Sequence, residues 1–182
     1  MEESIGIVEF RSIAIGIGAV DIIVKASDVR VVDARTLCPG KYYIIFAGSV
    51  SAVSNSLKVI VEQSHNFIID HTAISNVYPQ IFSAINQASQ LGELKSIGIV
   101  ETLTSPSIMV AADAAVKAAA VDLVEIRIAR ALGGKNMLII NGDVSSVNES
   151  VSAAIKYARD KDFLVDYRVI ASPHKDLYRV II

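Results

Sequence analysis

Two stretches of the chain carry the same six residues: Ser4-Ile5-Gly6-Ile7-Val8-Glu9 returns letter for letter as Ser96-Ile97-Gly98-Ile99-Val100-Glu101, 92 positions later. The agreement continues downstream in these pairs: Asp21 and Asp113, Lys25 and Lys117, Arg35 and Arg127, Gly40 and Gly134, Gly48 and Gly142, Pro79 and Pro173. After Arg127 the spacing becomes 94, so the second copy has gained two residues. Self-similarity over this length indicates a duplicated domain. We therefore expect one domain over residues 1–90 and a second over 91–182, joined by the polar stretch 86–95.

Each copy predicts the same six elements in the same order. Strand, helix, strand, strand, helix and strand are expected over 5–9, 12–27, 29–36, 42–47, 50–61 and 67–74, and again over 97–101, 106–119, 123–129, 137–140, 144–155 and 164–170. A short helix is expected after Pro79 and after Pro173. The order β-α-β-β-α-β predicts an α/β chain of the α+β, ferredoxin-like type, with helices on one face of an antiparallel sheet. Such folds serve many functions, so the fold alone does not assign one.

Local signals support two of these helices. Ser105 before Pro106 is typical of a helix start, with a capping hydroxyl followed by proline at the first helical position. In the second helix of the first copy, valine or leucine recurs at helical spacing at positions 50, 53, 57 and 61. We expect these four side chains to face the core.

The composition excludes several classes of protein. The 182 residues are 52% hydrophobic and 20% charged, with a net charge of −2, which excludes a disordered chain and a basic nucleic-acid-binding surface. Mean hydropathy is +0.48, yet no apolar run reaches the ~18 residues of a membrane span. The acidic start Met1-Glu2-Glu3 is unlike a signal peptide, and one cysteine allows no internal disulfide, so we expect a cytoplasmic protein.

The same composition bears on assembly. Domains of this size bury only roughly 60–65% of their surface on folding. Many aliphatic side chains must then stay at the surface or be covered by partner subunits. We expect extensive subunit contact, although a tight aliphatic core would also account for the composition.

Motifs of catalysis and of nucleotide binding are incomplete. Gly16-Ile17-Gly18 lacks the third glycine of a dinucleotide-binding loop, and Leu132-Gly133-Gly134-Lys135 is followed by Asn136 where a phosphate loop needs serine or threonine. The three histidines, His65, His71 and His174, lack metal-ligand spacing. We therefore expect a protein that is not an enzyme.

Cys38 is the candidate that remains. In Cys38-Pro39-Gly40, proline is suited to position i+1 of a turn and glycine to position i+2, so the thiol is expected at the surface. Arg35 and Lys41 flank it, and positive charge favours the reactive thiolate. Inert packing is the common role of a lone cysteine and stays open as the alternative.

These features together resemble the bacterial microcompartment shell-protein family. The resemblance covers nearly all of both copies and rests on the repeated hexapeptide and on four further motifs: Ala-Ala-Asp-Ala-Ala-Val-Lys-Ala-Ala at 111–119, Gly-Gly-Lys at 133–135, Gly-Asp-Val-Ser-Ser-Val at 142–147, and Pro173-His174. Tandem members of the family form pseudohexameric trimers that tile with other shell proteins. The resemblance implies that Lys25 and Lys117 lie at the tile edge. The arginine that often precedes the family's Pro-His is missing from both copies, which puts its lateral contact in doubt.

The resemblance also implies a role for Cys38. Leu37-Cys38-Pro39-Gly40-Lys41 is similar to the pore loop of a tandem subclass from propanediol-utilisation compartments, in which the cysteine binds an iron–sulfur cluster on the trimer axis. Leu132, Gly133 and Gly134 are the equivalent pore loop in the second copy. Since the chain has one cysteine, the resemblance implies a cluster of the 4Fe-4S type that three subunits share, for electron or cluster transfer across the shell, with encapsulated redox enzymes as partners.

Two alternatives stay open. The first is a shell tile with a metabolite-conducting pore and no cluster, in which Cys38 only lines the pore. The second is a small-molecule-binding regulator on a duplicated ferredoxin-like fold. Nothing in the sequence points to the pocket of convergent polar groups that a regulator would need.

Overall fold

The structure is a computed structural model that describes residues 4–85, 95–129 and 132–177. The chain divides into two compact units. The first runs to Val77 and also includes Thr104–Pro106 and Ala129–Gly134, and the second comprises Tyr78–Leu103, Ser107–Ile128 and the residues from Lys135 onward. Most of the polar stretch expected to join the two copies, residues 86–94, lies outside the described residues.

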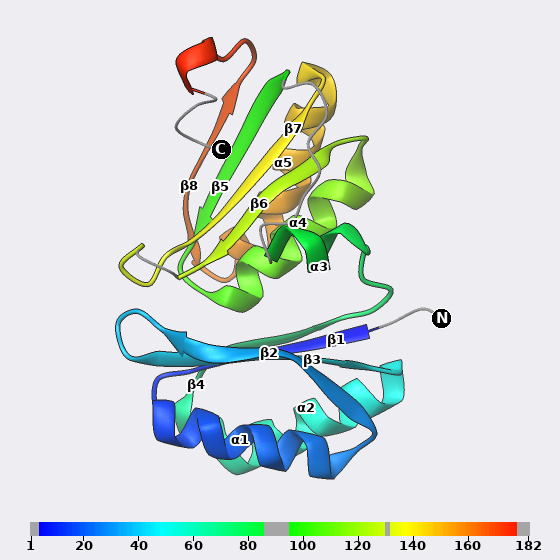
Figure 1. The fold of residues 1–182 in the computed structure, drawn as a ribbon, viewed down its shortest axis with the longest axis vertical. Coiled ribbons are helices and arrows are strands. Elements are labelled where there is room, and N and C mark those ends of the chain that lie inside the picture. The colour runs from blue at the N-terminus through cyan, green and yellow to red at the C-terminus, as the bar shows by residue number, and fades with distance from the viewer. Residues whose placement is uncertain (1–3, 86–94, 130–131, 178–182) are drawn as a thin grey trace. The chain divides into compact units, whose positions relative to one another are not determined.

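The first unit is one antiparallel sheet with two helices on one of its faces (Figure 1). Its elements are β1 (Ser4–Phe10), α1 (Ile13–Ala26), β2 (Val29–Leu37), β3 (Lys41–Gly48), α2 (Val50–Ser64), the 3₁₀ turn η1 (His65–Phe67) and β4 (Ile68–Ile74). The strand order is β2-β3-β1-β4, and each neighbouring pair is antiparallel.

The second unit repeats this plan. Its elements are α3 (Gln80–Ile85), β5 (Ser96–Thr102), α4 (Ser105–Ala118), β6 (Asp122–Ile128), β7 (Asn136–Gly142), α5 (Val144–Asp160) and β8 (Leu164–Ile170), and the first residues of α4 group with the first unit. The strand order β6-β7-β5-β8 matches that of the first sheet. The predicted pair of α+β domains is thereby confirmed. The lengths of the loops locate the two extra residues of the second copy between β6 and β7.

The strand registers show that the duplication extends to backbone detail. In the first sheet Glu9 faces Asp70 across the β1–β4 pair, and the register shifts at the next residue. In the second sheet Glu101 faces Asp166 and the same shift follows. Equivalent residues can therefore be compared position by position between the two units.

Serine residues cap the N-terminal ends of α1 and α2, whereas the predicted start of α4 is displaced. The hydroxyl of Ser12 accepts from the Ile15 N–H (3.4 Å) at the start of α1, and that of Ser49 accepts from the Ala52 N–H (3.2 Å) at the start of α2. The start predicted for α4 is wrong by one residue, because the helix already includes Ser105. The Ser105 hydroxyl accordingly does not cap α4 but donates to a carboxylate.

The predicted inner face of α2 is also partly wrong. Val53 is buried as expected, but Val50 is exposed, and the buried row continues instead through Ser56, Ile60 and Ser64. A serine fits this row because the Ser56 hydroxyl donates to the Ile23 carbonyl oxygen (2.9 Å) in α1. Helix α5 is built alike, with Ser150 donating to the Ala115 carbonyl oxygen (2.9 Å) in α4. The spacing of apolar residues alone cannot predict that a polar residue occupies a core position.

The core of the first unit fills the space between sheet and helices. It contains Val8, Phe10, Ala19, Ile23, Ile44, Phe46, Val53 and Ile60, all nearly inaccessible to solvent. Gly6 lies under the Phe46 ring, and a Cβ at this position would come within 2.2 Å of the ring. Its equivalent, Gly98, is crowded by Val151 and Ile140 instead. The glycine of the repeated hexapeptide is therefore required by close packing in both units.

We expect Gly6→Ala to lower the free energy of unfolding by about 1–3 kcal/mol, because the new methyl group overpacks the core. The clash is with the outer carbons of the Phe46 ring, which leucine lacks. In chemical denaturation, the double variant Gly6→Ala/Phe46→Leu should then be more stable than the sum of the single effects implies. Additive effects would show that the Phe46 ring is not the group that clashes with the new methyl group.

Candidate functional site: the Cys38 loop

The Cys38 loop, Leu37–Lys41, connects β2 to β3. Leu37 is buried and anchors the loop, whereas Cys38, Pro39 and Gly40 are exposed, so the thiol is at the surface as the turn chemistry predicts. The Gly40 N–H donates to the Leu37 carbonyl oxygen (2.9 Å), which places Cys38 at position i+1 of the turn and Pro39 at i+2. The predicted turn positions are therefore off by one. The Cys38–Pro39 peptide bond is cis, the geometry found at i+2 of a type VI turn.

The Gly134 loop, which is the equivalent loop of the second copy, lies against the Cys38 loop. Gly134 has a φ of 88°, and a Cβ there would stand 3.0 Å from the Cys38 carbonyl oxygen and 3.0 Å from the Pro39 Cδ. Gly133 also has a positive φ, 61°, but is exposed with no atom near its Cβ direction, and Leu132 is half-buried. The structure thus brings Cys38 and Gly134 together within the first unit.

The two cations that flank Cys38 are paired with carboxylates. Arg35 Nε donates to Asp33 Oδ1 (3.0 Å), and Lys41 Nζ donates to Glu9 Oε1 (2.7 Å). Asp33 also accepts from the Tyr43 hydroxyl, and burial followed by this hydrogen bond raises the pKa of Tyr43 well above its ordinary value. The positive surroundings predicted for the thiol are therefore balanced by Asp33 and Glu9.

The Cys38 thiol lies in open surroundings. Across the described ranges, no three His, Cys, Asp or Glu side chains gather as a metal site. The chain contributes one thiol, from Cys38, and a Cβ at Gly40 would meet no atom within 4 Å other than those of Gly40 and its chain neighbours. The thiol is therefore accessible at the surface of the turn.

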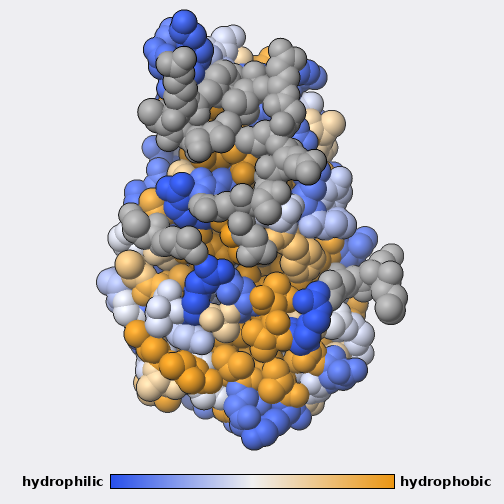
Figure 2. Space-filling model, in the orientation of Figure 1, coloured by the Kyte–Doolittle hydropathy of each residue, from blue (hydrophilic) through white to orange (hydrophobic). Residues whose placement is uncertain are grey.

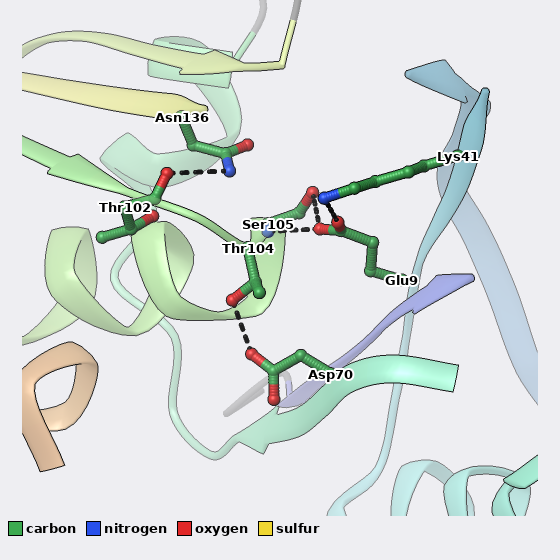
Figure 3. A network of polar contacts seen from close by, with 7 residues as sticks. All are labelled: Glu9, Lys41, Asp70, Thr102, Thr104, Ser105 and Asn136. Atoms are coloured by element: carbon green, nitrogen blue, oxygen red, sulfur yellow. Dashed lines mark hydrogen bonds and ion pairs between the residues drawn. The ribbon is translucent and has the colours of Figure 1, made fainter. Parts of the chain in front are cut away.

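Glu9 is a buried residue next to the Cys38 loop whose contacts the sequence did not indicate. Its Oε2 accepts from the Ser105 N–H (2.5 Å) and the Ser105 hydroxyl (2.6 Å) at the start of α4, while its Oε1 accepts from Lys41 (Figure 3). Asp70 lies beside it and accepts from the Thr104 hydroxyl (2.6 Å). A carboxylate at a helix N-terminus is favoured by the unpaired N–H groups and the helix dipole. The repeated glutamate at the strand end was a signal for this role.

The two predicted edge lysines have matching local contacts. Lys25 binds Asp21 and Lys117 binds Asp113, each at 2.6 Å and one helical turn apart. The side chain of Lys25 is more exposed than that of Lys117, and Asp113 also accepts from the Tyr78 N–H (3.0 Å). Each lysine thus ends an acidic–basic pair near the C-terminal end of the first helix of its copy.

Comparison with known proteins identifies the repeated unit. The BMC domain model matches the chain twice, over residues 4–77 and 96–173. The chain belongs to the BMC-domain family of bacterial microcompartment shell proteins. Family members are structural, which confirms that the chain is a microcompartment shell component and not an enzyme. No helix among the described residues is long and apolar enough to cross a membrane.

Individual relatives include tandem and single-domain shell proteins. The chain is 34% identical over its full length to the bacterial microcompartment shell protein PduT of Citrobacter freundii, covering 99% of that protein. It is 39% identical over 88 residues to the carboxysome shell protein CcmK2 of Synechococcus elongatus, covering 47% of this chain and 84% of that one. A crystal structure of a microcompartment protein from Desulfitobacterium hafniense superposes with a TM-score of 0.87 at 44% identity, covering 98% of this chain and 99% of that one.

We expect Gly134→Ala to lower the free energy of unfolding by about 2–3 kcal/mol, because a left-handed alanine is strained and its methyl group meets the Cys38 loop. Gly133→Ala is the matched control: it introduces only the backbone strain, at about 1 kcal/mol. The rate at which Cys38 reacts with a thiol reagent should change in Gly134→Ala and stay near wild type in Gly133→Ala. Equal thiol rates in the two variants would mean that Gly134 does not position Cys38.

Proposed function

We propose that the chain is a shell tile that forms a homotrimer and binds an iron–sulfur cluster, of the 4Fe-4S type, between its three Cys38 thiolates. The observation that carries the proposal is the exposed Cys38 thiol at the tip of a turn that contacts the Gly134 loop. The full-length similarity to a tandem shell protein supports the assembly. Such a cluster ordinarily needs about four thiolates, so a threefold axis would leave one iron to be ligated by water, a small thiol or a partner protein.

The residues around Cys38 would support this group in distinct ways. Leu37 anchors the loop, and the Glu9–Lys41 ion pair (2.7 Å) fixes its other end. Gly40 and Gly133 have no side chain in the way, so the backbone of these residues could approach a cluster, although the Gly40 N–H already donates to the Leu37 carbonyl oxygen (2.9 Å). An iron–sulfur cluster accepts and donates one electron at a time, and in a shell it would serve electron transfer to enclosed redox enzymes or supply the cluster itself to them.

The Cys38→Ser variant tests the ligand assignment. It removes the chain's one thiol, so after anaerobic reconstitution with iron and sulfide the visible absorption and EPR signal of wild type should be absent. The variant should keep the wild-type mass in light scattering, since the turn is exposed. A signal that survives in Cys38→Ser would refute the assignment. A wild-type protein that takes up no iron would instead favour the metabolite-conducting pore, with Cys38 as a lining residue.

The edge lysines give a second test of the tile. Replacing Lys25 and Lys117 together by alanine should abolish two-dimensional sheets in electron micrographs, because a long stem with a terminal ammonium can lie along a neighbour and donate to its carbonyls. Trimers should persist in light scattering. Lys58→Ala is the matched control, because Lys58 is as exposed as Lys25 and also pairs with a carboxylate one turn away. Sheets that still form from the double variant would show that these lysines are not at the edge.

A further inference from the structure

The second unit has an open pocket of about 590 Å³ where α4 leads into β6 and β7 leads into α5. All of the residues that line it belong to this unit. The Tyr78 N–H donates to Asp113 (3.0 Å), and Asp113 binds Lys117 (2.6 Å), so the pocket lies beside the predicted edge lysine. Its polar lining residues are Tyr78, Gln80, Lys95, Asp122, Asn141 and Asp143.

The pocket has unused hydrogen-bond acceptors. Lys95 Nζ donates to Asp143 Oδ1 (2.9 Å), and the Asp143 side chain makes no capping bond to α5 although it stands at the N-cap position. Within the part of the chain that the structure describes, no donor reaches Asp143 Oδ2 or either oxygen of Asp122. Carboxylate oxygens that converge in this way fit a cation with several N–H donors, and a guanidinium is such a group.

The first unit carries a cation at the position equivalent to Asp122. Arg30 pairs with Ala47 on the neighbouring strand, and Asp122 pairs with Asn141. Ala47 and Asn141 are equivalent, because each directly precedes the glycine that ends its strand. Arg30 and Asp122 are both exposed. The two copies therefore present opposite charges at the same position of the domain.

The neighbourhood of this position also differs between the copies. In the first unit the side chains of Lys25 and its partner Asp21 are 73% and 64% exposed, whereas those of Lys117 and Asp113 in the second are 39% and 10% exposed. In Figure 2 the hydrophilic side chains of the first unit form separate patches between apolar ones, so a few charges determine which surface can match it. The first unit thus offers exposed cations, and the second a better covered pocket with carboxylates.

We propose that neighbouring trimers meet with the first unit of one copy against the second unit of another, so that the partner's Arg30 donates to Asp122 and Asp143 in the pocket. When equivalent surfaces meet across a local twofold axis, equivalent positions lie opposite each other. Contact between two first units would oppose two arginines, and contact between two second units would oppose two aspartates, which is unfavourable. The inference rests on the proposed tile and adds which of its edges meet, and therefore how neighbouring tiles are oriented.

Charge reversal tests this pairing. Arg30→Asp would bring two acidic positions together and Asp122→Arg two basic ones, so we expect each variant to raise the critical concentration for sheet formation by about 10-fold or more. The double variant Arg30→Asp/Asp122→Arg exchanges the charges and restores an opposite pair, so its sheets should form near the wild-type concentration. Lys58→Asp is the matched control, because it changes the net charge as Arg30→Asp does, at an exposed lysine of α2.

The experiment compares the full-length wild type with these four variants by sedimentation and electron microscopy over a range of protein concentrations, and by light scattering below the critical concentration. We expect trimers of wild-type mass throughout, sheets from wild type, Lys58→Asp and the double variant, and none from the two single reversals at the wild-type critical concentration. Sheets from Arg30→Asp at that concentration, a double variant without sheets, or wild-type trimers that never form sheets would overturn the pairing. The cluster absorption of reconstituted trimers tests the proposed function separately, and a monomeric wild type would overturn the trimer as well.

Discussion

The first unit depends on a buried carboxylate and the groups that neutralise it. Glu9 is 1% exposed and is held by Lys41, by the Ser105 N–H and by the Ser105 hydroxyl. Removing one partner of a buried ion pair typically lowers the free energy of unfolding by about 3–5 kcal/mol, because the remaining charge is buried away from water without a partner. Lys41 directly follows the exposed turn of the Cys38 loop, and Ser105 begins α4. The Glu9 side chain therefore binds both the residue that ends the Cys38 loop and the first residue of α4.

The duplication explains why most of the fold was predictable from the sequence. The repeated hexapeptide located both first strands, and the order of the elements followed from local patterns, because these features depend on residues close in the chain. The faces of α2 and α5 were harder, since Ser56 and Ser150 are buried by hydrogen bonds to carbonyls in a neighbouring helix. Apolar periodicity cannot detect a polar residue whose partner lies about 35 residues away.

The exposure of the Cys38 thiol was predictable from the sequence, but its surroundings were not. The turn residues around Cys38 indicated an exposed thiol, and the structure agrees. The approach of Gly134 to the Cys38 carbonyl oxygen joins loops that are distant in sequence, so no local pattern could reveal it. The charges beside the thiol were misjudged for the same reason, because Glu9, which binds Lys41, lies 32 positions away in the sequence.

The contact between the Cys38 loop and the Gly134 loop has a consequence for the evolution of the chain. In a single-domain relative every subunit carries the same loop. The same loop sequence must then both hold a large residue and leave space for that residue in the neighbouring loop. Here the duplicated loops have diverged: one keeps Cys38 and Pro39, and the other has Leu132 and Gly133 at those positions, followed by Gly134, whose missing side chain makes space. In the duplicated chain, one loop therefore carries the thiol and the other leaves the space that its backbone occupies.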